Sequence, residues 1–363
     1  MKTYQQLVSS ADFQMHGHPI QSMSGSFAAI CNIAEDAPSD RYGTGAVIND
    51  FENQISELLG KESAIFFPSG TMAQQIAMRI ACDRKKLAKV AFHPFCHLQI
   101  HEQQGLQELH NIEGYLIGAE NRLFDLQDLA KLEEVSAVLF ELPQREIGGQ
   151  LPSWDALVEM CNWCKHQGIH THLDGARLFE VLPFYEKSAA QVCTLFDSVY
   201  ISFYKGLGGV CGAMLAASTP FMDQARIWKR RHGGDLYHLY PYVLTAKHAL
   251  ALRGSRMANY WEFAKAFAKR LNMIAGITTL PLIPQCNMFH VRFTIEYQEL
   301  QQALAQVINK HNLALLPVFR QYHSGEYYIE YWAGDNCSQV DTDLLNDAMT
   351  SLASELTPLI IAQ

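Results

Sequence analysis

The sequence contains no apolar run close to the roughly 18 residues that a membrane-spanning helix needs, so we expect no membrane span. Cationic residues are also scarce, because 28 Lys and Arg stand against 37 Asp and Glu, which gives a net charge of −9. Nucleic-acid binding relies on many cationic contacts to phosphates, and this charge balance argues against it. The N-terminal segment MKTYQQLVSSADF has no apolar stretch, so no export or transit signal is indicated and we expect a cytoplasmic protein.

The chain also lacks internal repeats, low-complexity tracts and the cysteine pattern of a disulfide framework. Its nine cysteines are odd in number and scattered through core-like segments, which is typical of reduced thiols in a reducing compartment. Apolar residues make up 48% of the 363 residues. This is enough for two lobes, or for one large α/β domain with an appendage.

Strand-like and helix-like segments alternate along the first two thirds of the chain. Residues 49–60 place apolar side chains on one helical face, residues 64–67 form a short apolar strand, and residues 72–82 return to helical spacing. The same alternation recurs at residues 135–142, 153–168, 169–173 and 198–204. It predicts an α/β fold with a mostly parallel sheet, in which ligands lie beyond the carboxyl ends of the strands.

The pattern becomes less regular beyond residue 245. Helix-like stretches alternate there with the strand-like segments HVRFTI at residues 290–295 and EYYIEYW at residues 326–332. We therefore predict a large α/β domain at residues 1–245 and a smaller C-terminal α+β domain at residues 246–363.

Two polar residues follow predicted strands, at the edge where a ligand is expected. Asp174 follows the strand-like IHTHL, and Lys205 follows SVYISFY and precedes three glycines in four residues. Because the carboxyl ends of parallel strands meet at one edge of a sheet, the two side chains can share a site. A lysine that forms a Schiff base and an aspartate beside a pyridine nitrogen indicate pyridoxal 5'-phosphate (PLP). The alternative is that Asp174 caps a turn and Lys205 is a solvated loop residue.

The turn PSGT at residues 68–71 joins a predicted strand to a predicted helix. The free backbone N–H groups of Ser69, Gly70 and Thr71, together with the helix dipole, are suited to hold a phosphate. No lysine follows the turn, so it is not a Walker P-loop. The alternative is that the turn is simply a tight connection.

Histidines cluster in the segment HPFCHLQIHE, residues 93–102. On a helix, the spacing of His93, Cys96, His97 and His101 would line one face with possible metal ligands. A proline interrupts the run and no carboxylate or cysteine pair completes a ligand set, so we predict no metal. The other interpretation is that a single imidazole stacks on an aromatic cofactor ring.

Six segments, taken together and in order, resemble the threonine aldolase and aromatic amino acid β-eliminating lyase family of PLP-dependent enzymes. They are YGTGAVINDFENQISELLGKESAIFFPSGTMAQQ (42–75), HLQIHE (97–102), ELPQREIGG (141–149), HLDGARLFE (172–180), DSVYISFYKGLGG (197–209) and RRHGG (230–234). The resemblance implies the PLP-dependent transferase-like fold, known as fold type I. The C-terminal lobe matches the family only in outline.

The resemblance implies roles for individual residues. Lys205 would form the Schiff base, Asp174 would pair with the pyridinium nitrogen, and His97 would stack on the ring. Arg177 would lie beside the ring hydroxyl or the substrate carboxylate. The phosphate would be held by Ser69, Gly70 and Thr71, with Ser202 and Arg230 as weaker candidates.

The implied activity is cleavage of L-threonine, L-allo-threonine or a related β-hydroxy amino acid to glycine and an aldehyde. One alternative keeps the cofactor but eliminates a β-substituent to give ammonia and a 2-oxo acid, and another is a catalytically silent cofactor-binding protein. The general base stays open among His97, His101, Glu102 and a water held by them. The resemblance also implies a homodimer or homotetramer that acts on a small-molecule amino acid substrate.

The chain departs from the family pattern at several positions. Gly45 stands where many members have aspartate, Tyr204 where serine is usual, and Gln144 where a histidine is common. In the predicted register, Glu330 occupies the place of an arginine that clamps the substrate carboxylate, and a glutamate would repel that group. Either another cation takes this role, with Arg177, Arg145 and Arg320 as candidates, or the substrate differs.

Overall fold

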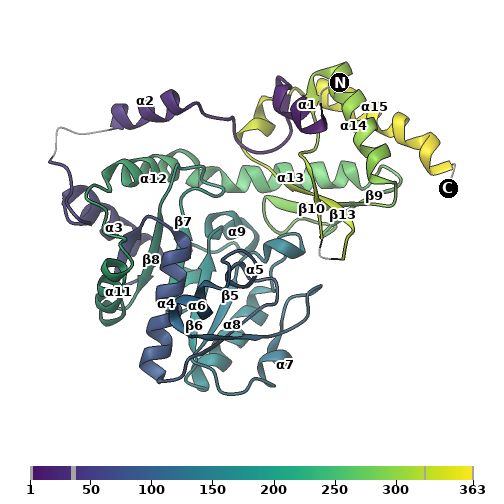
Figure 1. Ribbon diagram of the computed structural model, residues 1–363. Coiled ribbons are helices and arrows are strands. Elements are labelled where there is room, and N and C mark those ends of the chain that lie inside the picture. Colours follow the sequence, from purple (N-terminus) through teal and green to yellow (C-terminus); the bar gives the residue numbers. More distant parts are fainter. Residues whose placement is uncertain (1–2, 34–37, 323, 362–363) are drawn as a thin grey trace. The chain divides into compact units, whose positions relative to one another are not determined.

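The chain forms two compact units in the computed structural model, which describes residues 3–33, 38–322 and 324–361 (Figure 1). The larger unit contains Gln21–Glu146 and Leu151–Ser255, and the smaller contains Met1–Ile20, Ile147–Gln150 and Arg256–Gln363. Residues 1–20, which the sequence-based division places in the large domain, therefore group with the C-terminal part.

A seven-stranded sheet forms the centre of the larger unit, in the order β2-β8-β7-β6-β5-β3-β4. The strands are β2 (Ser63–Phe67), β3 (Lys89–Phe92), β4 (Glu113–Leu116), β5 (Ala137–Glu141), β6 (His170–Gly175), β7 (Ser198–Ser202) and β8 (Ala213–Ala217). The strands from β7 to β4 pair in parallel, and β8 pairs antiparallel with both β7 and β2. The predicted α/β fold with a mostly parallel sheet is confirmed.

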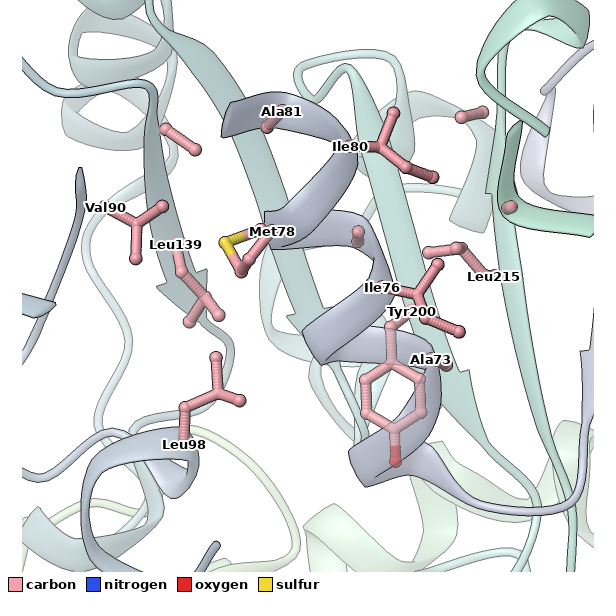
Figure 2. Packing of buried hydrophobic residues seen from close by; sticks show 14 of the residues in the cluster. Ala73, Ile76, Met78, Ile80, Ala81, Val90, Leu98, Leu139, Tyr200 and Leu215 are labelled. Carbon is pink, nitrogen blue, oxygen red and sulfur yellow. The ribbon is translucent and has the colours of Figure 1, made fainter. Parts of the chain in front are cut away.

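Helices connect or flank these strands, and several of them pack on the sheet. They are α2 (Met23–Ile33), α3 (Ala46–Leu59), α4 (Gly70–Lys85), α5 (His97–Ile100), α6 (Gly105–His110), α7 (Leu126–Leu129), α8 (Trp154–His166), α9 (Leu178–Tyr185), α10 (Ala189–Cys193), α11 (Thr219–Arg231) and α12 (Tyr240–Arg253). Figure 2 shows part of the buried cluster that α4 forms with the strands, including Ile76, Ile80, Val90 and Leu215. Full burial of each such side chain contributes roughly 1.5–3 kcal/mol, which fixes α4 and the turn before it against the sheet.

A four-stranded antiparallel sheet, in the order β12-β13-β10-β9, forms the centre of the smaller unit. The elements of this unit are α1 (Tyr4–Ser10), β1 (Phe13–Gln14), α13 (Met257–Leu271), β9 (Ile277–Leu280), β10 (Met288–Phe293), α14 (Tyr297–His311), β11 (Leu313–Ala314), β12 (Phe319–Gln321), β13 (Tyr327–Trp332) and α15 (Thr342–Ile361). Strand β1 pairs in parallel with β11, which is why residues 1–20 group with the C-terminal part. Within the described ranges of both units, no helix is long and apolar enough to cross a bilayer.

Candidate active site

Seven of the candidate residues named from the sequence line one pocket of the larger unit: Thr71, His97, His101, Arg145, Asp174, Arg177 and Lys205. The pocket lies at the carboxyl ends of parallel strands, since Asp174 lies near the end of β6 and Lys205 follows β7. This is the edge at which open α/β sheets bind their ligands. The structure therefore brings Asp174 and Lys205 to one site, as their positions after predicted strands suggested.

Asp174 presents a buried carboxylate to this pocket. Its Oδ2 accepts a hydrogen bond from Gln74 Nε2 at 3.0 Å, and its Oδ1 accepts one from the Ala176 N–H at 3.0 Å. Burial raises the pKa of the Asp174 carboxyl, while the nearby His97 imidazole lowers it. A buried carboxylate is stabilised by a cationic partner, so this group is suited to bind a protonated ring nitrogen.

The loop after β7 carries Lys205 into the pocket. The next residue is Gly206, where an added Cβ would lie 2.0 Å from Oε1 of Glu180 on α9, so any side chain there would displace the buried Glu180 carboxylate. Burial lowers the pKa of Lys205, and the guanidinium groups of Arg177 and Arg145 lower it further. A lysine with a lowered pKa is more readily present as the neutral amine, which is the form that attacks a carbonyl.

The turn before α4 has the features of an anion site. Ser69 is the N-cap residue of α4, and the first N–H groups of a helix have no intrahelical carbonyl partner. At Gly70 an added Cβ would lie 2.0 Å from Tyr200 Oη and 2.6 Å from Tyr200 Cζ, so only glycine fits. Thr71, in the same turn, lines the pocket. The start of α4 is thus suited to hold a phosphate at the pocket.

His97 begins the short helix α5 on the pocket wall. Its Nδ1 lies 3.1 Å from Glu102 Oε1, and its backbone N–H donates to Glu141 Oε2 at 3.1 Å. Burial lowers the pKa of His97, but the hydrogen bond to Glu102 and the neighbouring carboxylates outweigh this effect and raise the pKa. The result is a flat imidazole fixed by Glu102, which is suited to lie against an aromatic cofactor ring.

The three histidines of residues 93–102 have different surroundings. His93 Nε2 lies 3.0 Å and 2.9 Å from the carbonyl oxygens of Ala119 and Arg122, so this ring holds a neighbouring loop. His97 and His101 instead line the pocket. Among the residues that the structure describes, no three His, Cys, Asp or Glu side chains are grouped to hold a metal ion.

Ser202 and Arg230, the two weaker candidates for phosphate binding, are not among the residues that line this pocket. Ser202 is buried at the end of β7, where its Oγ accepts a hydrogen bond from the Tyr204 N–H at 3.3 Å. Arg230 is exposed, with Nη1 3.7 Å from Asp235 Oδ2 and its guanidinium over the ring of Tyr42. In the described part of the larger unit, neither belongs to the pocket lining, so their link to a cofactor phosphate stays a prediction.

The pocket also contains residues that the sequence analysis gave no role, including Gln74, Glu141 and Glu146. Glu141 ends β5 and is the Cα partner of Asp174 on β6. Burial and the Asp174 carboxylate raise the pKa of Glu141. The rule that identified Asp174, a polar residue at the end of a strand, applies equally to Glu141 and could have found it. Gln74 lies one turn inside α4, where sequence gives no comparable signal.

Two departures from the family pattern have a structural explanation. An added Cβ at Gly45 would lie 2.8 Å from Asp40 Cα, so the backbone leaves no room for an aspartate there. Asp40 is itself fully buried, and its carboxylate accepts hydrogen bonds from the N–H groups of Leu239 and Tyr240 at the start of α12. In the smaller unit, Glu330 Oε1 lies 3.3 Å from Arg320 Nη2, so an arginine is present beside the glutamate.

Comparisons with known proteins agree with this geometry. The model of a protein family described as Beta-eliminating lyase matches residues 18–294. Low-specificity L-threonine aldolase 1 of Arabidopsis thaliana is 26% identical over 271 residues, which cover 72% of this chain and 75% of that protein.

Two crystal structures are similar over nearly the whole chain. A candidate L-allo-threonine aldolase from Listeria monocytogenes EGD-E is 45% identical with a TM-score of 0.94, covering 97% of this chain and 99% of that one. A candidate aromatic amino acid beta-eliminating lyase/threonine aldolase from Exiguobacterium sp. 255-15 is 43% identical, with the same TM-score and coverage. A structure of serine palmitoyltransferase with PLP, at 15% identity and a TM-score of 0.68, shows the shared fold alone.

Proposed function

The chain belongs to the beta-eliminating lyase family of PLP-dependent enzymes, and from this membership we propose the reaction that its pocket performs. The proposed reaction cleaves the Cα–Cβ bond of L-threonine, L-allo-threonine or a related β-hydroxy amino acid, and releases glycine and an aldehyde. The observation that carries the proposal is the presence of Lys205 and Asp174 in one pocket, at the carboxyl edge of the sheet.

The residues of the pocket fit PLP. The cofactor, when bound, accepts the electron pair that remains on Cα after a bond to that carbon breaks. Asp174 would keep the ring nitrogen protonated, and the amine of Lys205 would hold the cofactor until the substrate amine replaces it. His97 would lie against the ring. The phosphate would be held by Ser69, Gly70 and Thr71, with Ser202 and Arg230 as weaker candidates.

We propose that the guanidinium group of Arg177 binds the substrate carboxylate. It lines the pocket together with Arg145, and its Nε lies 3.8 Å from Glu180 Oε2, which restricts its orientation. A guanidinium can form two parallel hydrogen bonds to a carboxylate. Such a contact fixes the substrate in the pocket and so orients the Cα–Cβ bond that is to be broken.

Product analysis tests the proposed reaction. Purified, cofactor-loaded protein is incubated with L-allo-threonine and with L-threonine, and glycine plus acetaldehyde is measured against ammonia plus 2-oxobutanoate. We expect glycine and acetaldehyde in equal amounts. Ammonia and 2-oxobutanoate would instead indicate β-elimination, the alternative that the relatives do not favour, and would refute Cα–Cβ cleavage.

We also propose that the protein is cytoplasmic and forms a homodimer or homotetramer. The family resemblance supports the assembly, and the reduced cysteines support the compartment, since the nine thiols are free in the structure. Light scattering after size-exclusion chromatography distinguishes the two assemblies, and a monomer at micromolar concentration would contradict both.

A further inference from the structure

A second pair of imidazole and carboxylate groups lies in the pocket beside His97 and Glu102. His101 Nε2 lies 3.0 Å from Glu146 Oε1, and Arg145 Nη1 donates to the same oxygen at 2.8 Å. The ring centroids of His97 and His101 are 5.1 Å apart. Glu146 therefore connects a second histidine to an arginine on the wall of the catalytic pocket.

The two histidines differ in their suitability as a base. His97 is bonded to Glu102, its side chain is 32% exposed, and neighbouring carboxylates raise its pKa although burial opposes them. Nδ1 of His97 is therefore already engaged by Glu102. The side chain of His101 is 41% exposed and therefore more accessible to a substrate group that enters the pocket.

The contact with Glu146 also selects the tautomer of His101. A neutral imidazole has one N–H, and a carboxylate beside Nε2 favours the tautomer in which Nε2 is the donor. Nδ1 then keeps its lone pair and is the atom that can accept a proton. The second contact of Glu146, to Arg145, holds the carboxylate in place.

We propose that His101, oriented by Glu146, takes the proton of the substrate's β-hydroxyl as the Cα–Cβ bond breaks; this rests on the proposed function above. The O–H bond breaks and its proton moves to His101 Nδ1, while the oxygen forms the carbonyl of the aldehyde. The electron pair of the broken bond remains with Cα, which then takes up one proton to give glycine. Glu146 is a positioning residue in this scheme, because it acts through His101.

His101→Asn is the first test, with His166→Asn as the matched control at the exposed end of α8. Aldehyde release from L-allo-threonine should fall on the order of 100-fold or more, as expected when a general base is lost. Exchange of the α-hydrogen of glycine in D2O should persist, because glycine has no β-hydroxyl. The absorption spectrum of the loaded protein should be unchanged.

Three outcomes would overturn the proposal. Aldehyde release within about twofold of the unsubstituted protein would show that His101 is dispensable, because loss of a general base lowers the rate far more than this. An equal fall in glycine exchange would show that His101 acts on another step or on the fold. If the unsubstituted protein exchanges glycine but releases no aldehyde, the proposed function itself is wrong, and the role of His101 falls with it.

Variants of Glu146 test the positioning role, with Glu159→Gln as an exposed control on α8. Glu146→Gln keeps an acceptor oxygen and should retain more activity than Glu146→Ala, with the loss in kcat and little change in KM. Nitrogen-15 NMR of the loaded protein gives an independent measurement of the His101 tautomer. We expect Nε2–H in the unsubstituted protein and loss of this preference in Glu146→Ala, whereas a predominant Nδ1–H tautomer would refute the assignment.

Discussion

Replacement of Gly70 by alanine tests how closely the start of α4 packs on the sheet. An alanine Cβ would lie 2.0 Å from Tyr200 Oη and 2.6 Å from Tyr200 Cζ. Tyr200 lies in β7 and is 2% exposed, so its ring cannot move into solvent. Since real Cβ contacts are almost never shorter than 3.0 Å, the ring or the helix must shift by about 1.0 Å.

Two opposing terms set the magnitude. Forcing an extra carbon into a well-packed region costs about 1–3 kcal/mol, and a displacement of this size belongs at the upper end. Alanine in place of glycine favours a helix by up to about 1 kcal/mol. We therefore expect a net loss of about 2 kcal/mol, or roughly 4–8 °C in Tm for a unit of this size.

Thermal unfolding of the cofactor-free protein, at fixed protein concentration, measures this loss. Gly254→Ala is the matched control, because Gly254 has helical backbone angles. A Cβ added there would lie 3.2 Å from Cδ1 of Leu250, which is the end of a flexible side chain. Affinity for PLP should also fall in Gly70→Ala, since the displaced turn is the proposed phosphate site. A Gly70→Ala protein that melts at or above the unsubstituted protein would refute the steric reasoning.

Three further substitutions test other parts of the structure. Lys205→Ala should remove the visible absorbance of the loaded protein and abolish turnover, while the protein still folds. The exposed control Lys165→Ala should change neither property. Normal turnover by Lys205→Ala would contradict the assignment of Lys205. Burial, reinforced by a neighbouring imidazole, lowers the pKa of His172 to about 3, so the unfolded chain binds a proton that the folded protein does not. Above about pH 6.5 this histidine is neutral in both the folded and the unfolded chain and does not lower the free energy of unfolding. Between that pH and pH 3 the free energy of unfolding falls by about 1.4 kcal/mol per pH unit. His172→Asn should therefore flatten the dependence of Tm on pH. Glu330→Arg would place a second cation beside Arg320 and should destabilise the protein by about 2 kcal/mol, and the double variant with Arg320→Glu should restore most of that loss. Improved cleavage of threonine by Glu330→Arg would support the predicted register, and unchanged kinetics would count against it.

Much of the fold follows from local sequence patterns. Buried strands of the large sheet were predicted because β5 and β7 contain short apolar segments, residues 137–140 and 199–201, as strands covered on both faces do. The grouping of residues 1–20 with the C-terminal part had no such signal. It depends on the pairing of β1 with β11, two segments about three hundred residues apart, and a two-residue strand has no recognisable pattern.

The candidate site shows the same division. Asp174 and Lys205 could be found because one lies near the end of a strand and the other follows a strand. The parallel direction of those strands brings both residues to one edge of the sheet. The contact between Glu146 and His101 could not be found, because 45 residues separate them and neither has a distinctive neighbour in sequence. Their meeting depends on how the loop after β5 returns past α5.

By itself, the sequence determined the α/β fold and predicted the edge of the sheet at which Asp174 and Lys205 lie in one pocket. These features depend on periodicity and on residue type at strand ends, which are local properties of the chain. Only the tertiary structure decided which acidic groups face which histidines, and why Gly70 and Gly45 must lack side chains. Those features depend on distances between segments far apart in sequence, and packing, rather than local pattern, sets such distances.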